Sequence, residues 1–407
     1  MSENGARPAI RFTGFTDAWE QRELSDVADI VGGGTPSTII NEYWGGDVDW
    51  YAPAEIGEQI FVKGSQNKIT EMGLQNSSAK ILPVGTVLFT SRAGIGNTAI
   101  LAKKGATNQG FQSIVPHKDE LDSYFIFSRT HELKRYGETV GAGSTFTEVS
   151  GKQMAKMPIS IPEIPEQKKI SQLFSAIDDL ITLHQRKYDK LVNIKKAMLG
   201  KMFPQNGASV PEIRIAGFIG AWKKRKLEDV VEFYSGLTYS PTNVVDSGGT
   251  LVLRSSNVKD GEIKKDDTVF VASEVVNSYN VEVGDIIVVV RNGSKSLIGK
   301  HAQIKEDMPC TVIGAFITGI RSEQPAFMNA LLNTHAFDRE IEKNMGATIN
   351  QITNGMFRSM AFFFPKNQEQ FQIGVFFQHL DHLIALQQRK LQKLRNFKMA
   401  CQEKMFV

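Results

Sequence analysis

Several short polar loops carry residue types that bind nucleic acid. TSRAGIGNT at 90–98 and VRNGSKS at 290–296 each follow a strand-like run and place an arginine and an asparagine among glycines. TNQGFQS at 107–113, LRSSNVKDG at 253–261 and the turn GGGTPS at 32–37 have a similar polar composition. Arginine donates two hydrogen bonds to guanine and Asn or Gln pairs with adenine, while Ser, Thr, Lys and backbone amides hold phosphates. The candidate DNA-binding residues are Thr35, Ser37, Arg92, Asn97, Asn108, Gln109, Arg254, Asn257, Arg291, Asn292, Ser294 and Lys295.

Catalytic and metal-binding patterns are missing from the sequence. GSKSLIGKH at 293–301 resembles a phosphate-binding loop, but its second glycine comes one residue too late and no Ser or Thr follows the lysine. His379 and His382 do not form the His-Glu-x-x-His pattern of a zinc protease. We therefore predict no catalytic residues, no metal ligands and no cofactor of the chain's own. The polar loops then belong either to a binding surface or to ordinary turns.

Composition and charge restrict the class of protein. The chain has 407 residues, enough for two or three domains at about 150 residues each. Its 47 Lys and Arg against 44 Asp and Glu leave a net charge of +3, too small to indicate nucleic-acid binding by itself. Two cysteines do not make a disulfide framework, and the sequence has no signal-peptide core and no run of about 18 apolar residues. We expect a cytoplasmic protein without a membrane span.

The sequence is an internal repeat in which residue n matches residue n + 203. LITLHQRKYDKL at 180–191 returns as LIALQQRKLQKL at 383–394, and IRFTGFTDAWEQRELSDV at 10–27 returns as IRIAGFIGAWKKRKLEDV at 213–230. Between these anchors the identity almost vanishes, although a common skeleton persists. The chain therefore consists of two tandem copies of a globular part followed by a helix. The anchor segments recur in both copies, whereas most residues between them differ.

The end of each copy has the apolar periodicity of a coiled coil. Apolar residues alternate at spacings of three and four over roughly five heptads, and some 38 residues would span about 57 Å. One position of the seam is polar in both copies, either as a tolerated substitution or as a lock on the register. The expected seam residues are Ile170, Phe174, Ile177, Ile181, His184, Tyr188, Leu191, Ile194 and Met198 in the first copy, and Ile373, Phe377, Leu380, Ile384, Gln387, Leu391, Leu394 and Phe397 in the second.

We predict a mixed α/β fold with two globular domains in a pseudo-two-fold arrangement, separated by two long antiparallel coiled-coil helices. The expected boundaries are 1–164 for the first domain, 165–205 for the central helix, 206–366 for the second domain and 367–407 for the C-terminal helix.

Inside the domains, strand-like and helix-like runs alternate. The expected strands include 81–90, the apolar run 283–290 and 311–320. Helices are expected at 122–137 and 325–343, before each long helix.

The residues described so far resemble one known family. The duplicated PEQKKI…LFSAIDDLI…QRK…KL helix, the W..R.L.DV opening of each copy and the GGGTPS turn are similar to those of the specificity subunit of type I restriction–modification systems. The resemblance covers essentially the whole chain. It implies that the globular parts are target-recognition domains, each of which reads one half of an interrupted, asymmetric sequence in double-stranded DNA.

The resemblance also implies a set of partners. The two helices of such a subunit act as a spacer and bind two methyltransferase subunits, and through these the translocating restriction subunits. The subunit itself is not catalytic, because S-adenosylmethionine, ATP and Mg²⁺ are used by its partners. A coiled-coil adaptor that binds no DNA is the alternative, since the net charge is nearly neutral.

Overall fold

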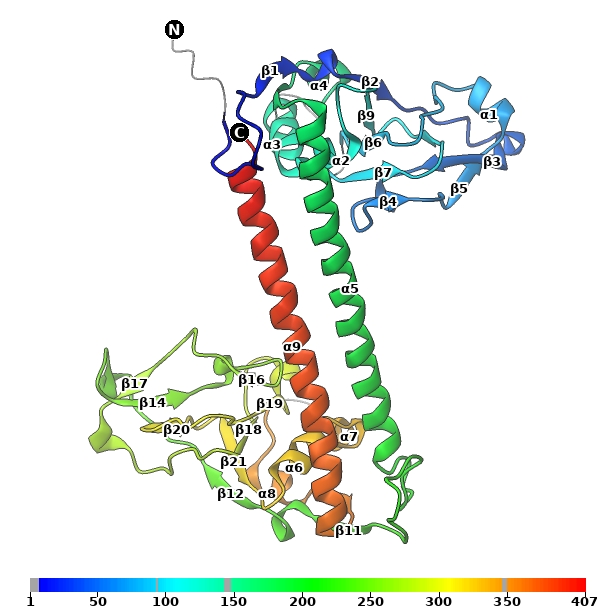
Figure 1. The fold of residues 1–407 in the computed structure, drawn as a ribbon. Helices are drawn as coiled ribbons and strands as arrows, with labels where there is room; N and C mark the ends of the chain where they lie inside the picture. Colours follow the sequence, from blue (N-terminus) through cyan, green and yellow to red (C-terminus); the bar gives the residue numbers. More distant parts are fainter. Residues whose placement is uncertain (1–6, 93, 143–147, 346–349) are drawn as a thin grey trace. The chain divides into compact units, whose positions relative to one another are not determined.

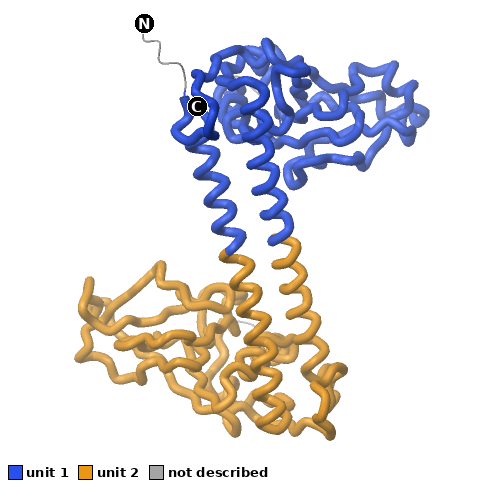
Figure 2. Tube along the Cα trace, viewed as in Figure 1, with its two compact units in different colours: residues 1–184, 390–407 blue, residues 185–389 orange. Residues whose placement is uncertain are grey.

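The chain forms two compact units, each described here by itself (Figure 1, Figure 2). Unit 1 contains residues 1–184 and 390–407, and unit 2 contains residues 185–389. The globular part of unit 1 is called head 1 (up to residue 163), and that of unit 2 is called head 2 (203–366). The computed structural model describes residues 7–92, 94–142, 148–345 and 350–407.

Two long helices belong to both units. They are α5 (Ile164–Met202) and α9 (Asn367–Met405). Each unit contains the first part of one helix and the last part of the other. The compact units therefore cut across the four-segment division expected from the sequence. None of the described helices combines the length and apolar character needed to cross a bilayer.

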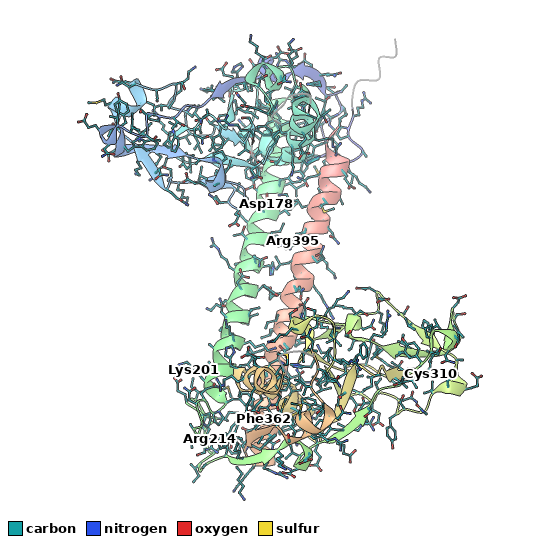
Figure 3. The ribbon with its side chains drawn as sticks, turned by 180° about the vertical axis from the view of Figure 1, so that it is seen from behind. Asp178, Lys201, Arg214, Cys310, Phe362 and Arg395 are labelled. Carbon is teal, nitrogen blue, oxygen red and sulfur yellow. The ribbon has the colours of Figure 1, made fainter. Side chains whose placement is uncertain are left out.

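Repeated ion pairs show that the two helices run antiparallel where they meet. In unit 1, Lys398 Nζ lies 2.6 Å from Asp178 Oδ1, on the part of α5 labelled in Figure 3. In unit 2, Lys195 Nζ lies 2.6 Å from Asp381 Oδ1. Within unit 1, Phe174 contacts Phe406 and Asp178 pairs with Lys398, so the number on α9 falls as that on α5 rises. Within unit 2, the pairs Lys195–Asp381 and Phe203–Phe377 show the same order. Both ion pairs obey the offset of 203, so each unit contains the same contact built from opposite helices.

Most of the expected seam residues are shielded from solvent. Every expected seam residue from Ile170 to Leu191 and from Ile373 to Leu394 is buried or half-buried, including the polar pair His184 and Gln387. Phe397 was wrongly assigned to the seam, because its side chain is 53% exposed.

Head 1 consists of short strands and helices. The strands are β1 (Glu20–Glu23), β2 (Ala28–Gly32), β3 (Trp44–Tyr51), β4 (Phe61–Val62), β5 (Asn67–Ile69), β6 (Val87–Phe89), β7 (Thr98–Leu101), β8 (Ala106–Thr107), β9 (Gln112–Pro116) and β10 (Pro158–Ile161). The helices are α1 (Glu71–Gln75), α2 (Ser123–Ser128), α3 (Thr130–Gly141) and α4 (Gly151–Ala155). The sheets have the orders β2-β9-β6-β7-β4, β5-β3-β8 and β1-β10. Only β4–β7 and β3–β8 are parallel pairs among these strands.

Head 2 repeats this plan with different details. The strands are β11 (Lys223–Lys226), β12 (Glu232–Ser235), β13 (Val244–Val245), β14 (Thr250–Leu253), β15 (Val258–Lys259), β16 (Glu262–Ile263), β17 (Phe270–Val271), β18 (Ile286–Val289), β19 (His301–Gln303), β20 (Thr311–Ile313), β21 (Ile317–Arg321) and β22 (Ala361–Phe364). The helices are α6 (Pro325–Leu332), α7 (His335–Asn344) and α8 (Asn354–Ser359). The larger sheets have the orders β12-β21-β18-β19 and β13-β17-β14-β20, and β11 pairs with β22 as β1 does with β10.

Some expected elements are continuous and others are broken. Residues 286–289 of the apolar run at 283–290 form β18, a fully buried strand inside its sheet, whereas Val283 is 61% exposed. The expected strand at 311–320 is two strands in different sheets, because the chain turns at Gly314, whose amide bonds Leu253 O. The expected helices at 122–137 and 325–343 are also divided, into α2 with α3 and α6 with α7. Buried apolar contacts can follow a bent chain as well as a straight one, so periodicity alone does not locate such breaks.

A buried ion pair ties the start of each head to the start of its long helix. Arg11 donates to both carboxylate oxygens of Glu166 at 2.7 Å, and Arg214 donates to both oxygens of Glu369 at 2.8 Å. The glutamates are almost fully buried, and the hydrogen bonds to them raise the pKa of each arginine. Bidentate pairing is the geometry in which a buried carboxylate is well compensated. This explains why both residues recur in the repeat.

The end of α9 completes the core of head 1. Phe406 lies 5.4 Å from Phe174, 5.6 Å from Phe125 and 6.3 Å from Trp19, measured between ring centroids. Met405 and Cys401 join the same buried cluster. The last residues of the chain are therefore core residues of the first domain.

The end of α5 does the same for head 2. Phe203 lies 5.5 Å from Phe327, 5.9 Å from Trp222 and 6.0 Å from Phe377. The phenylalanine of the repeated KMF sequence thus packs into the core of the head in the unit where its helix ends. Phe406 and Phe203 are called the aromatic plugs of head 1 and head 2.

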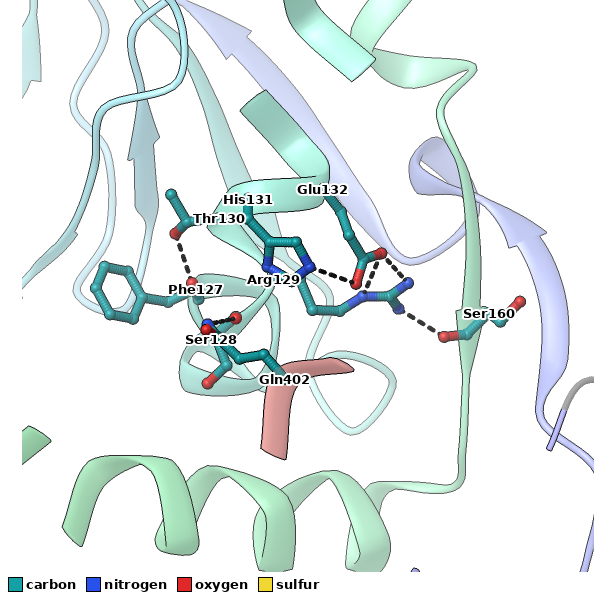
Figure 4. Close-up of polar contacts among 8 residues, drawn as sticks. All are labelled: Phe127, Ser128, Arg129, Thr130, His131, Glu132, Ser160 and Gln402. Carbon is teal, nitrogen blue, oxygen red and sulfur yellow. Dashed lines mark hydrogen bonds and ion pairs between the residues drawn. The ribbon is translucent and has the colours of Figure 1, made fainter. Parts of the chain in front are cut away.

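Polar contacts link the end of α9 to the residues around Arg129 (Figure 4), whose guanidinium lies 5.6 Å from the ring of Phe406. Gln402 Nε2 on α9 donates to Ser128 O at 2.9 Å. The neighbouring Arg129 is 2% exposed, donates to Ser160 O at 2.6 Å and pairs with Glu132. The buried Arg129 guanidinium thus has hydrogen-bond partners, as a low-dielectric site requires.

The plug of unit 2 is apolar at the same positions. The residues equivalent to Gln402 and Arg129 are Leu199 and Leu332, and both leucines are buried in the core of head 2. The two helix ends therefore differ in polarity, since Gln402 is half-buried and hydrogen-bonded whereas Leu199 is buried among apolar residues.

We predict that the two plugs stabilise different heads. Replacing a buried Phe with Ala destabilises a core by about 3–5 kcal/mol. Phe406→Ala should lower the stability of head 1, and Phe203→Ala that of head 2. Hydrogen exchange read by mass spectrometry should show lost protection in β6 and β9 for the first variant and in β18 and β21 for the second. The prediction is wrong if Phe406→Ala leaves the exchange of β6 unchanged.

Candidate nucleic-acid interface

Head 2 gathers three chain segments at one end of its strands. Arg254 follows β14, Arg291 follows β18, and Phe316 lies in the turn between β20 and β21. Arg254, Phe316 and Tyr239 line a cavity of about 580 Å³, and the Arg291 guanidinium lies over the ring of Phe316. The two arginine loops that the sequence singled out in the second copy therefore belong to one surface.

Hydrogen bonds connect the two arginine loops of head 2. Asn292 Nδ2 donates to Ser255 Oγ at 2.8 Å, and Asn292 Oδ1 accepts from the Ser294 amide at 2.9 Å. The Arg291 guanidinium lies 5.1 Å above the ring of Phe316, and the side chains of both residues reach the surface. A cation stacked on an exposed aromatic ring can offer both its donors and the ring face to a base.

Arg254 has a carboxylate partner in the same surface. Its Nη2 lies 2.5 Å from Asp267 Oδ2, and both side chains are partly exposed. Asn257, by contrast, is 1% exposed. Its amide donates to Lys264 O and Asp267 O at 2.9 Å, and its oxygen accepts from the Arg254 amide at 2.8 Å. The structure therefore corrects the prediction for Asn257, which holds the loop and is not available to a base.

A buried carboxylate fixes the strand that carries Arg291. Asp285, next to β18, accepts from Tyr234 Oη at 2.7 Å and from Arg321 Nε at 2.8 Å. Burial and the Asp285 carboxylate raise the pKa of Tyr234, and the hydrogen bond to Asp285 raises the pKa of Arg321. This network joins β12 and β21 to the start of β18.

Head 1 gathers the corresponding segments through its glycine-rich turn. The Gly34 amide donates to Thr107 O at 2.8 Å, and Thr35 Oγ1 donates to Gln109 Oε1. A Cβ on Gly33 would lie 2.0 Å from Asn108 O, so only glycine allows this approach. The turn at 32–37 and the loop at 107–113 thus lie side by side.

Arg92 lies next to these segments. Its Nη1 is 3.9 Å from Glu148 Oε2. A Cβ built on Gly110 would lie 3.7 Å from Arg92 Nε and 2.8 Å from Pro53 Cγ. Gly110 in head 1 is equivalent to Phe316 in head 2. Gly110 O accepts from the Ser91 amide, and Phe316 O accepts from the Val290 amide, in each case the residue before the arginine. Arg92 therefore lies beside a glycine, whereas Arg291 lies beside an aromatic ring.

Three other candidates lie apart from these clusters or make no contact with them. Asn97 is exposed and lies beside Gly57, on the other arm of the loop that follows β6. Ser37 is exposed, and its carbonyl accepts from Trp44 Nε1 at 3.1 Å. Lys295 borders a separate open cavity of about 1090 Å³ with Lys300 and Arg339.

Four residues of the interface were missed in the sequence. Phe316 falls inside the strand expected at 311–320, and no motif marks Tyr239, Glu148 or Asp267. The glycine in GAF at 314–316 was the one available signal of a turn that exposes Phe316. The acidic pair could be found only in three dimensions, because Glu148 is far from Arg92 in the chain. Within the part of the chain that the structure describes, no group of three His, Cys, Asp or Glu side chains could hold a metal ion.

Comparison with known proteins identifies the family of the chain. Residues 16–193 and 220–396 each match the family model described as type I restriction modification DNA specificity domain. The chain belongs to this family. Each specificity domain contains one head and most of the long helix that follows it.

Relatives of these specificity domains agree with the repeat. The MjaIX specificity subunit of Methanocaldococcus jannaschii is 37% identical over 46% of this chain and 44% of its own length. The EcoR124I/EcoR124II specificity subunit of Escherichia coli is 26% identical over 42% of this chain and 46% of its own. The chain thus spans just under half the length of these two relatives. The MjaVIII specificity subunit of M. jannaschii, 22% identical, matches over 93% of this chain and 90% of its own.

Solved structures support the fold of the two specificity domains. The S subunit of a type I restriction-modification system from M. genitalium has a TM-score of 0.67 at 14% identity, with 99% of both chains covered. A chain from a study of complex assembly in the type I R-M system has a TM-score of 0.52 at 18% identity, with 95% of this chain and 97% of that chain covered. These likenesses show that the predicted architecture is the family's fold.

We predict that Asn257 stabilises its loop instead of reading DNA. Asn257→Ala should lower the free energy of unfolding by about 1–3 kcal/mol, because buried backbone groups lose their partners. The matched control Ser294→Ala, at an exposed position, should change it by less than about 0.5 kcal/mol. Chemical denaturation of the two variants measures both effects. Equal stability of Asn257→Ala and the parent chain would contradict this assignment.

Proposed function

We propose that the chain is the DNA-recognition subunit of a type I restriction–modification complex. Each head would read one half of a bipartite, asymmetric target in double-stranded DNA. The observation that supports this most is that one structural frame carries two different sets of surface residues. Where head 1 has Gly110 and Glu148 around its arginine, head 2 has Phe316 and Gln351. Two unlike readers on equivalent scaffolds suit a target whose halves differ.

The chain would provide recognition and leave catalysis to its partners. S-adenosylmethionine, ATP and Mg²⁺ would be bound by methyltransferase and restriction subunits, in keeping with the absence of catalytic motifs from the sequence. A coiled-coil adaptor without DNA contact would give no role to the polar loops of either head. The arginines around each cluster supply the donors that base edges accept.

Exposed leucines repeat on the two long helices. They point to a partner that is bound twice, because each pair is found in a different unit and obeys the offset of 203. Leucines at these positions are neither seam nor core residues, and unpartnered apolar surface indicates a docking site. The residues are Leu180 and Leu183 on α5 and Leu383 and Leu386 on α9.

A groove in unit 2 extends this apolar surface. Leu386 and Val283 line a cavity of about 540 Å³ between α9 and the turn before β18, with Phe377 at its base. In unit 1, Val84 occupies the same turn before β6 and is exposed to the same extent as Val283, about 60%. We infer that these two surfaces bind two methyltransferase subunits, and through them the restriction subunits.

We predict that the arginines of the two heads act on different half-sites. Loss of a bidentate guanine contact removes about 1–3 kcal/mol of discrimination at one base. Arg92→Ala should relax one position in one half of the target, and Arg291→Ala one position in the other. Methylation mapping of genomic DNA from cells that express each variant with its partner subunits measures this. Arg135→Ala, on the exposed face of α3, is the control and should leave the motif intact. Unchanged motifs in both loop variants would exclude these loops as readers.

We predict that the leucine surfaces bind one methyltransferase subunit each. A charge in place of a central leucine removes its burial energy of about 1.5–3 kcal/mol and adds a desolvation penalty. Native mass spectrometry should find two partners on the parent chain, one on Leu183→Asp or Leu386→Asp, and none on the double variant. Ile219→Asp, at a fully exposed site in head 2, is the control. Two partners on every variant would contradict the assignment.

A further inference from the structure

The residue opposite the loop arginine is charged in head 1 and neutral in head 2. Arg92 and Glu148 face each other in an isolated antiparallel bridge, as do Arg291 and Gln351. The flanking hydrogen bonds agree, since the residue after each of these, Val149 or Ile352, donates its amide to the residue before the arginine at 2.9 and 2.8 Å. Positions 148 and 351 are therefore the same place in the two heads. They also obey the offset of 203.

Position 148 carries a carboxylate that reaches solvent together with its arginine. Glu148 Oε2 lies 3.9 Å from Arg92 Nη1, and the two side chains are 38% and 39% exposed. At that distance and exposure the pair contributes little to stability. Both side chains can therefore form hydrogen bonds with another molecule, because little free energy is lost when their ion pair breaks. Gln351 has the same length as Glu148 but no charge, and Arg291 beside it is stacked on Phe316.

The two side chains make different demands on a base edge. An ionised carboxylate only accepts hydrogen bonds, whereas a carboxamide both donates and accepts. In the major groove, cytosine N4 and adenine N6 are donors, while guanine O6 and thymine O4 are acceptors. A base next to the one held by arginine must therefore present an amino group to Glu148. Gln351 can pair with an amino or a keto base.

We propose that positions 148 and 351 are specificity-determining residues of the two heads, and that Glu148 restricts one base of its half-site to cytosine or adenine. The carboxylate rejects guanine and thymine at this base because their groove edges set an acceptor against an acceptor. Gln351 imposes no such restriction on the other half-site. This inference rests on the proposed function, since it assigns a base to a head that reads DNA.

A reciprocal exchange tests the proposal. Glu148→Gln should admit guanine and thymine at one position of one half-site. Gln351→Glu should exclude keto bases at one position of the other. Discrimination at the affected base should change by roughly 5- to 150-fold, the equivalent of about 1–3 kcal/mol. The readout is methylation mapping, followed by binding of the assembled complex to duplexes that differ at that base pair.

The position of the change distinguishes reading from mere support of Arg92. If Glu148 only orients Arg92, then Glu148→Gln should relax the same base as Arg92→Ala and no other. A change confined to that base would overturn the proposal, and so would an unchanged motif. Both positions are on the surface, so melting temperatures within about 2 °C of the parent chain are expected, and the binding assay is normalised to assembled complex.

The parent chain separates the two levels of inference. If the parent complex directs methylation to no defined sequence, the proposed function itself fails, and this proposal with it. If the parent complex modifies a bipartite motif and Glu148→Gln modifies the same motif with the same base preference, the function stands and only the assignment of Glu148 fails. An amino-to-keto relaxation in one half-site supports both.

Discussion

Each head depends on an aromatic side chain from the end of a helix that starts outside its own globular sequence. Phe406 lies among the rings of head 1, and Phe203 among those of head 2. A core that lacks a fully buried phenylalanine loses several kcal/mol, a large part of the stability of an ordinary domain. Neither head is therefore complete without both helices, and this constraint explains why the frame is repeated in full.

The repeated residues are those that the frame needs. The Arg–Glu pairs at the start of each helix, the Lys–Asp pairs between the helices and the aromatic plugs all recur at the same offset. Each of these is a contact between distant parts of the chain, in which a change at one partner leaves the other unsatisfied. The surface loops make few such contacts, so their residues are free to differ between the two copies.

The near-neutral net charge is consistent with the proposed role in DNA recognition. Arg254 and Arg92 each have a carboxylate partner, Asp267 and Glu148, within the same surface. Such pairs lower the general attraction to phosphate, which depends on unpaired positive charge. When DNA binds, the arginine must also break its ion pair, so the base edge has to supply hydrogen bonds that compensate for the lost carboxylate. Selectivity is then favoured over affinity for any DNA.

The sequence by itself determined the repeat, the long helices with their seam, the buried strand β18 and the family, because each of these is written in regular spacing or in residues that recur. It also placed arginine loops at the ends of equivalent strands. Only the tertiary structure decided that Asn257 is a buried support, that Phe316 and Glu148 lie beside the two arginines, and that each helix end belongs to the core of a head. These facts depend on contacts between residues tens to hundreds of positions apart. Local periodicity reports which face of an element is apolar, but it does not report which distant segment covers that face.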